Sequence, residues 1–220
     1  MGAAVEEAVK RGFDVIDMVD EACTFENLKA MIETENAEVV IAGGHGSSNV
    51  FTGQNQQVVL QACQNDQVMN GTISHFLSCL IGQTLLPSII SKGGVFTIGY
   101  IVSFEFMVDT NFPVEEDPYA EPFKDCTIAI VAKMLDGATL KQVWDAGIAK
   151  CDEWIQKLWD RPETDWAQVI GCLENNRDGM IGLGDQEAYV MPPRRLALST
   201  GPVLPVIIGI GFLALAEKLR

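Results

Sequence analysis

A histidine and a cysteine of this chain stand where they could carry out thiol chemistry. His45 follows the apolar run 37–42 within a glycine-rich turn, and Cys79 follows the strand-like segment 72–78. An imidazole beside a thiol accepts its proton or stabilises the thiolate, and the thiolate is the nucleophilic form of cysteine. The two residues are therefore a candidate catalytic dyad, on the condition that the fold brings them together.

The residues around this pair predict further parts of a nucleophilic site. Gly44 and Gly46 have no side chain, so the main chain there can approach a substrate carbonyl closely. The N–H groups of Gly46 and Cys79 are expected to form an oxyanion hole. A helix predicted to begin near Leu80 would direct its positive end toward the sulfur and lower the pKa of the thiol.

Hydrophobic periodicity predicts that strands and helices alternate along the chain. Strands are expected at 13–19, 37–42, 72–78 and 94–99, helices at 3–11, 24–34, 55–69, 80–91, 124–135 and 139–158, and two short late elements at 167–173 and 179–183. Connections of this length favour parallel strands joined by right-handed crossovers. The predicted fold class is therefore α/β, with a mostly parallel sheet flanked by helices.

Sheets of this class bind ligands outside the carboxyl ends of their strands. If strands 37–42 and 72–78 are neighbours connected by the helix 55–69, then His45 and Cys79 emerge side by side at one edge. One feature does not fit, because the chain opens on a helix where such a sheet normally opens on a strand. Either an upstream strand is missing, or the sheet has one strand fewer.

The composition restricts the partners that this protein can have. With 15 Lys and Arg against 30 Asp and Glu, the formal net charge is −15, and this argues against a nucleic-acid partner. The six cysteines are scattered singly and only two histidines are present, which argues against a structural zinc site and a disulfide framework. We expect no metal and no cofactor.

The C-terminal part of the chain differs from the rest. We expect one domain over residues 1–190, followed over 191–220 by a basic, proline-containing linker and an apolar segment. Residues 196–216 are 21 positions without a charge, close to the roughly 20 residues that cross a bilayer core, so this segment is a candidate membrane anchor. The alternative is a buried terminal strand and turn in a cytoplasmic protein, because the prolines and glycines there weaken a helix in water.

On these motifs the chain resembles the caspase-like cysteine peptidases of clan CD, the group that includes gingipains, separase and bacterial peptidases related to the CHAT domain. The resemblance rests on segments 39–46 and 76–79, whose His45 and Cys79 are 34 positions apart, and it covers roughly residues 1–190. It implies a three-layer caspase-like fold and a cysteine-type endopeptidase acting on polypeptides. Cys79 would be the nucleophile that forms an acyl-enzyme, His45 its general base or imidazolium partner, and Gly46 an oxyanion-hole donor.

The resemblance also directs attention to the pocket that receives the residue before the cut. Ser103, Phe104 and Glu105 follow the predicted strand 94–99 and are expected to line this pocket. If Glu105 or Asp109 points inward, a substrate with Arg or Lys at that position is favoured, because a buried carboxylate needs a counter-charge.

Two other residues compete for the catalytic roles. The run Gln61 to Asn65 nearly matches a caspase signature around Cys63, but Asn65 replaces the final glycine and His45 lies only 18 residues upstream. Cys63 also falls in a helical pattern, so we reject it as the nucleophile. His75 lies inside a predicted strand and is expected to be a structural histidine with its hydrogen bonds satisfied.

Two alternatives to a peptidase stay open at this point. A non-catalytic caspase-like scaffold or assembly subunit tethered to a membrane would keep the fold without turnover. A different hydrolase or transferase on a flavodoxin-like sheet is the other alternative, although the sequence contains no G-x-S-x-G elbow, no P-loop and no G-x-G-x-x-G at its first turn. The sequence leaves the oligomeric state open.

Overall fold

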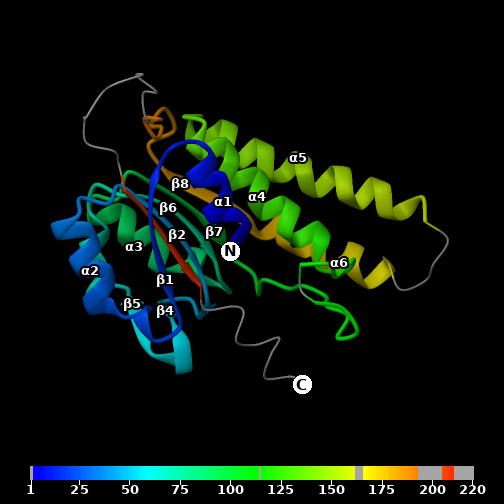
Figure 1. The fold of residues 1–220 in the computed structure, drawn as a ribbon, viewed down its shortest axis with the longest axis horizontal. Helices are drawn as coiled ribbons and strands as arrows, with labels where there is room; N and C mark the ends of the chain where they lie inside the picture. Colours follow the sequence, from blue (N-terminus) through cyan, green and yellow to red (C-terminus); the bar gives the residue numbers. More distant parts are fainter. Residues whose placement is uncertain (1, 114, 162–165, 193–204, 211–220) are drawn as a thin grey trace.

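A computed structural model describes residues 2–113, 115–161, 166–192 and 205–210, the last of these as backbone only. Its centre is a six-stranded sheet with helices on both faces (Figure 1). In spatial order the strands are β1 (Asp14–Val19), β9 (Pro205–Ile210), β2 (Val39–Gly43), β6 (Ile73–Leu77), β7 (Phe96–Tyr100) and β8 (Met180–Gly184). The first five run parallel and β8 is antiparallel to β7. The predicted α/β class with a mostly parallel sheet is confirmed.

Each face of the sheet is covered by a separate set of helices. The helices are α1 (Gly2–Lys10), α2 (Phe25–Thr34), α3 (Leu85–Ser91), α4 (Glu121–Leu135), α5 (Leu140–Trp159) and α6 (Trp166–Gly179). Ile41 and Ile98 pack into one core with α1, α4 and α5, whereas Val40 and Phe76 pack into another with α2 and α3 (Figure 1). Burial on both faces explains why residues 39–42 form a continuous apolar run.

Two helices begin with capping interactions. The Thr24 side chain accepts a hydrogen bond from the Asn27 N–H at 3.1 Å and begins α2. Thr139 and Gln142 form a reciprocal capping box at the start of α5. Such caps satisfy N–H groups that have no partner within the helix, and both helices lie where the sequence predicts them.

The predicted helix over 55–69 is wrong. A small antiparallel sheet stands there, made of β3 (His45–Gly46), β4 (Val50–Thr52) and β5 (Val58–Gln61) and flanked by the short 3₁₀ turns Gln54–Gln56 and Asp66–Met69. Asn55, Gln56 and Cys63 have positive φ angles, a conformation that ends a right-handed helix. Cross-strand pairing with β4 therefore prevails over the helical spacing of the apolar residues.

The helix predicted over 80–91 begins later than expected. Leu80 is left-handed, with φ of 61°, a 3₁₀ turn covers Ile81–Gln83, and α3 starts only at Leu85. Pro87 explains this start, because a proline has no N–H for the helix ladder and is tolerated only in the first turn. The segment predicted as short at 167–173 is instead the full helix α6, which leads directly into β8.

The strand between β1 and β2 comes from the C-terminal part of the chain. Pro205 to Ile210 pair in parallel with β1 on one side and with β2 on the other (Figure 1). This matches the terminal-strand alternative for the part of the apolar segment that is described; the remainder of 196–216 lies outside the described residues. Among the described residues, no helix is both long and apolar enough to span a bilayer.

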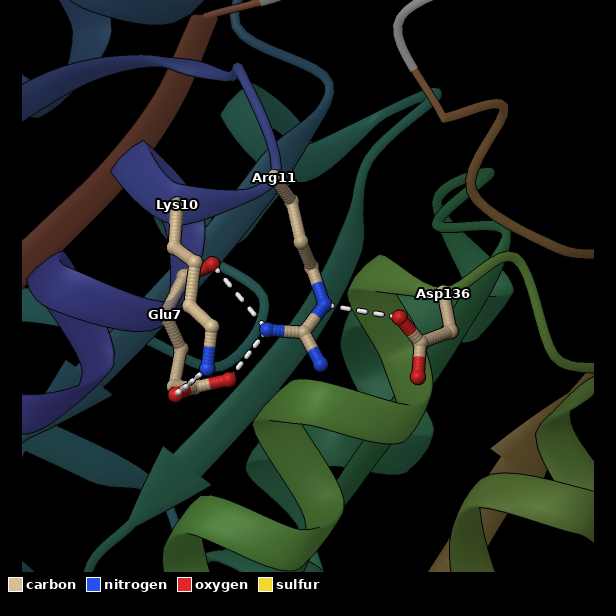
Figure 2. A network of polar contacts seen from close by, with 4 residues as sticks. All are labelled: Glu7, Lys10, Arg11 and Asp136. Carbon is tan, nitrogen blue, oxygen red and sulfur yellow. Dashed lines mark hydrogen bonds and ion pairs between the residues drawn. The ribbon is translucent and has the colours of Figure 1, made fainter.

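A polar network attaches α1 to the end of α4 (Figure 2). The Arg11 guanidinium donates to Asp136 at 2.7 Å and to Glu7, which also pairs with Lys10 at 3.6 Å. The hydrogen bond from Arg11 lowers the pKa of Glu7, while the hydrogen bond to Asp136 raises the pKa of Arg11. This network fixes α1 to the end of α4.

Candidate functional site

The candidate site lies where β2 and β6 end. These strands are parallel neighbours, and the register pairs Gly43 with Leu77 as the last residues of each. His45 and Cys79 both lie two positions beyond this pair, so both emerge at the same rim of the sheet. The predicted adjacency and common direction of the two strands are confirmed, although a small sheet rather than a helix connects them.

The main chains that carry the two residues pack directly on one another. The Gly44 N–H donates to the Leu77 carbonyl at 3.2 Å. A Cβ on Gly46 would contact the Ser78 hydroxyl and lie 2.9 Å from the Cys79 carbonyl oxygen. Glycine is required at position 46 because of this close approach, and a side chain there would push the histidine segment away from the cysteine.

His45 is held at the rim by the small sheet. It pairs with Thr52 of β4, and the Thr52 hydroxyl donates to the His45 carbonyl at 3.3 Å. The histidine is exposed, so its side chain is accessible from solvent. The predicted placement of an accessible imidazole at this rim agrees with the structure.

Cys79 sits on a sharp turn that stores backbone strain. Its sulfur is half-buried and donates to the Phe104 carbonyl at 3.8 Å. The next residue, Leu80, is left-handed, which costs a non-glycine residue about 1–2 kcal/mol. Its N–H donates to the Val102 carbonyl at 2.8 Å, which holds the turn in place. Strained residues of this kind cluster at functional sites.

The sequence predicts a helix that begins beside the Cys79 sulfur, but in the structure no helix begins there. Leu80 and the following 3₁₀ turn stand where the helix was expected to begin. The first N–H of α3, at Leu85, donates to the Ser48 carbonyl at 2.9 Å and does not face the sulfur. The left-handed conformation of Leu80 explains the difference, because it interrupts the chain between Cys79 and α3.

Two amides at the rim suit the predicted oxyanion hole. The Ser47 N–H donates to the Val50 carbonyl at 2.9 Å, so Ser47 and Val50 form a hydrogen-bonded pair. Hydrogen-bonded and non-hydrogen-bonded pairs alternate in an antiparallel ladder. The next pair, Gly46 and Phe51, is therefore a non-hydrogen-bonded pair. The Gly46 N–H therefore points away from β4. Within the described part of the chain, the Cys79 N–H has no hydrogen-bond acceptor among backbone or side-chain groups.

The predicted substrate segment passes beside the sulfur and is fixed by α6. Asn176, which is buried, accepts from the Glu105 N–H at 2.9 Å and donates to the Glu105 carbonyl at 2.6 Å. Its neighbour Asn175 donates to the Ser103 carbonyl at 2.8 Å. Sequence reasoning missed these two clamping residues; the signal that could have indicated them is a pair of adjacent asparagines, which are poor helix formers, inside a helix.

The three residues of this segment differ in where they point. Phe104 is buried and stacks edge-on against Tyr100, with ring centroids 4.9 Å apart. Its ring belongs to the core, where the residue lines a small cavity, and its carbonyl accepts from the Cys79 thiol. Ser103 and Glu105 are exposed. Side chains along an extended segment point alternately to opposite sides. Because the apolar Phe104 ring points into the core, Ser103 and Glu105 point outward.

The two carboxylates considered for specificity are also separated. Burial and the nearby charge of Glu105 raise the pKa of the Cys172 thiol on α6, which places the Glu105 side chain beside that helix. Asp109 instead accepts from the Asn111 N–H at 2.9 Å and closes its own loop. Of these two carboxylates, only Glu105 directly follows Phe104, the residue whose carbonyl contacts Cys79.

The two competing residues lie away from the rim. Cys63 follows β5, and its N–H donates to the Ser88 hydroxyl on α3 at 3.3 Å. His75 is fully buried in the middle of β6, and burial lowers its pKa to about 4, offset in part by the main chain of Ile98. Within the described part of the chain neither ring nitrogen has a hydrogen bond of normal geometry. His75 is buried inside the sheet, as its place in the predicted strand suggests, but the full set of hydrogen bonds expected for it is not found among the described residues.

The described residues include no cluster of three or more His, Cys, Asp or Glu side chains arranged to hold a metal ion. No protein-family model matches the sequence, and no curated protein and no solved structure matches it either. The interpretation of the site therefore depends on its geometry.

Proposed function

We propose that this protein is a cysteine-type endopeptidase with a caspase-like fold, in which Cys79 and His45 form the catalytic dyad. The observation that carries the proposal is the register of β2 and β6. It places both residues two positions beyond the paired ends of neighbouring parallel strands, and Gly46 lies against the Cys79 carbonyl. The helices on both faces of the sheet suit the three-layer architecture that the resemblance implies.

The proposed reaction uses groups at this rim. His45 takes the proton of the Cys79 thiol, and the thiolate attacks the substrate carbonyl carbon. The N–H groups of Gly46 and Cys79 stabilise the resulting oxyanion. His45 then protonates the departing amine, which leaves an acyl-enzyme. Water, deprotonated by the same imidazole, hydrolyses the thioester and restores the free thiol.

The charge beside the site favours a basic substrate. Glu105 is exposed next to the segment that contacts Cys79, and the formal net charge of −15 attracts cationic peptides and repels anionic ones. We expect cleavage after Arg or Lys. Glu105→Gln should reduce the preference for basic over neutral residues about tenfold in a positional peptide library, and Asp109→Gln is the matched control that should leave it unchanged.

Thiol labelling tests the proposal most directly. Iodoacetamide at mildly acidic pH reacts quickly only with a thiol that is already ionised. We expect selective modification of Cys79, loss of that selectivity in His45→Ala, and no change in Cys63→Ser, which removes an exposed thiol away from the rim. Equal, slow labelling of all the cysteines, together with no cleavage of any library peptide, would instead favour the non-catalytic scaffold.

A membrane tether is not part of this proposal. The part of the apolar C-terminal segment that is described forms a strand within the sheet, and this strand is needed between β1 and β2. A test for peptidase activity therefore has to use the full chain.

A further inference from the structure

Two thiols meet in the interior, away from the candidate site. Cys126 on α4 and Cys151 on α5 are both buried, and their Sγ atoms share a hydrogen bond at 3.0 Å. A disulfide has an S–S length of about 2.05 Å, so a movement of about 1 Å would allow the sulfurs to bond. Both residues belong to one hydrophobic cluster, on helices α4 and α5 that lie side by side (Figure 1).

The surroundings make the two sulfurs chemically unequal. The hydrogen bond shared with Cys126 lowers the pKa of Cys151, whereas burial and the Asp152 carboxylate raise it and the Arg177 guanidinium lowers it. The same hydrogen bond and burial raise the pKa of Cys126. Cys151 is therefore the more easily ionised of the two thiols, which makes it the attacking group and Cys126 the resolving thiol.

A small cavity borders the pair. Its lining includes both sulfur-bearing residues together with Tyr100, Phe104 and Asn176. So small a space excludes a bulky disulfide such as oxidised glutathione, and a small peroxide is the class of oxidant that suits it. The pair therefore differs from Cys63, which is exposed and whose thiol forms a hydrogen bond with the Ser88 hydroxyl.

We propose that Cys126 and Cys151 are a redox modification site, at which hydrogen peroxide forms a reversible intramolecular disulfide between α4 and α5. The Cys151 thiolate attacks one peroxide oxygen, the O–O bond breaks, and hydroxide leaves while Cys151 becomes a sulfenic acid. The Cys126 sulfur then attacks the Cys151 sulfur and expels the hydroxyl group, which takes up the thiol proton as water. Overall, two thiols and one peroxide give one disulfide and two waters, and a dithiol reductant reverses the reaction.

Peptide mapping of the full chain tests this site. The protein is treated with hydrogen peroxide, the remaining thiols are blocked with iodoacetamide in denaturant, and the digest is analysed by mass spectrometry. We expect a cross-linked peptide that joins residues 126 and 151, has lost two hydrogen atoms and disappears on treatment with dithiothreitol. A Cys79→Ala background removes the proposed nucleophile as a competitor, so the result does not depend on whether the protein is a peptidase.

Variants and a stability measurement distinguish a real site from two thiols in passive contact. Cys126→Ala and Cys151→Ala should each abolish the cross-link, whereas Cys172→Ala, which removes another cysteine of the helical layer, should keep it. Oxidation of the parent protein should raise the melting temperature by several degrees, because closing the loop between the helices restricts the unfolded chain. If peroxide oxidises Cys63 while Cys126 and Cys151 are still alkylated after denaturation, the proposal is wrong.

Discussion

The two histidines of this chain occupy contrasting regions of adjacent strands. His45 stands two residues beyond the end of β2, is exposed and is fixed through its main chain to β4. His75 lies in the middle of β6, is fully buried, and has a pKa lowered to about 4 by that burial. The same side chain is thus accessible at the rim of the sheet but is held neutral in its interior.

This difference shows that position relative to the strand end decides what a polar side chain can do. Inside the sheet both faces are covered by helices, so an imidazole there loses its hydration and gains no hydrogen bond of normal geometry among the described residues. Beyond the strand end, glycines and strained turns bring main-chain amides and side chains together. The predictions below test this distinction, from the largest expected effect to the smallest.

Removing either member of the proposed dyad should have the largest effect. We expect Cys79→Ala and His45→Ala each to lower kcat/KM at least about 10³-fold, and the double variant to lose little more, because residues that act as a unit are not additive. Steady-state kinetics on the best library peptide would measure this. The matched control is His75→Ala assayed at neutral pH, since a buried neutral histidine has no role in turnover. Additive losses for the dyad would show that the two residues act independently.

Gly46→Ala should separate the two rim segments without unfolding the protein. The new Cβ would meet the Ser78 hydroxyl and the Cys79 carbonyl, so we expect about a 10²-fold loss of kcat, the size associated with a misplaced oxyanion-hole donor.

Gly171→Ala on α6 is the control for this change, because nothing lies within 4 Å of its Cβ position. It should keep full activity and be slightly more stable, since alanine is favoured over glycine in a helix. Ser78→Ala added to Gly46→Ala removes one of the clashing atoms and should recover part of the activity. Wild-type kcat in Gly46→Ala would contradict the close approach.

His75 should make the stability of the fold depend on pH. Its pKa is about 4 in the folded state and about 6.5 in an unfolded chain, so the unfolded state binds the proton first as the pH falls. Stability is therefore complete above about pH 6.5 and decreases by roughly 3 kcal/mol as the pH falls to about 4. Denaturant unfolding of His75→Leu at several pH values should lack this part of the decrease, whereas His45→Leu should keep it.

Much of the fold could be predicted from the sequence because helices and buried strands leave strong periodic signals. The strands that carry His45 and Cys79, the Thr24 and Thr139 caps, and the common rim all follow from local patterns. The hairpin at 50–61 could not be predicted, since its apolar spacing also fits a helix and its positive φ angles are not visible in residue types such as Asn55 and Gln56. The position of β9 between β1 and β2 depends on pairing across most of the chain, which no local pattern encodes. The side-chain clamp from Asn176 is likewise a tertiary contact.

The smallest predicted effect concerns the strained turn after Cys79. Leu80→Ala and Leu80→Gly both remove the side chain, but only glycine adopts the observed φ of 61° without strain. We therefore expect the glycine variant to be more stable than the alanine variant by about 1 kcal/mol, measured by chemical denaturation. At the exposed helical position Lys133 the order should reverse, with alanine more stable than glycine by about the same amount. If alanine is the more stable replacement at both positions, Leu80 is not held in the left-handed conformation, and the turn that presents Cys79 is not strained.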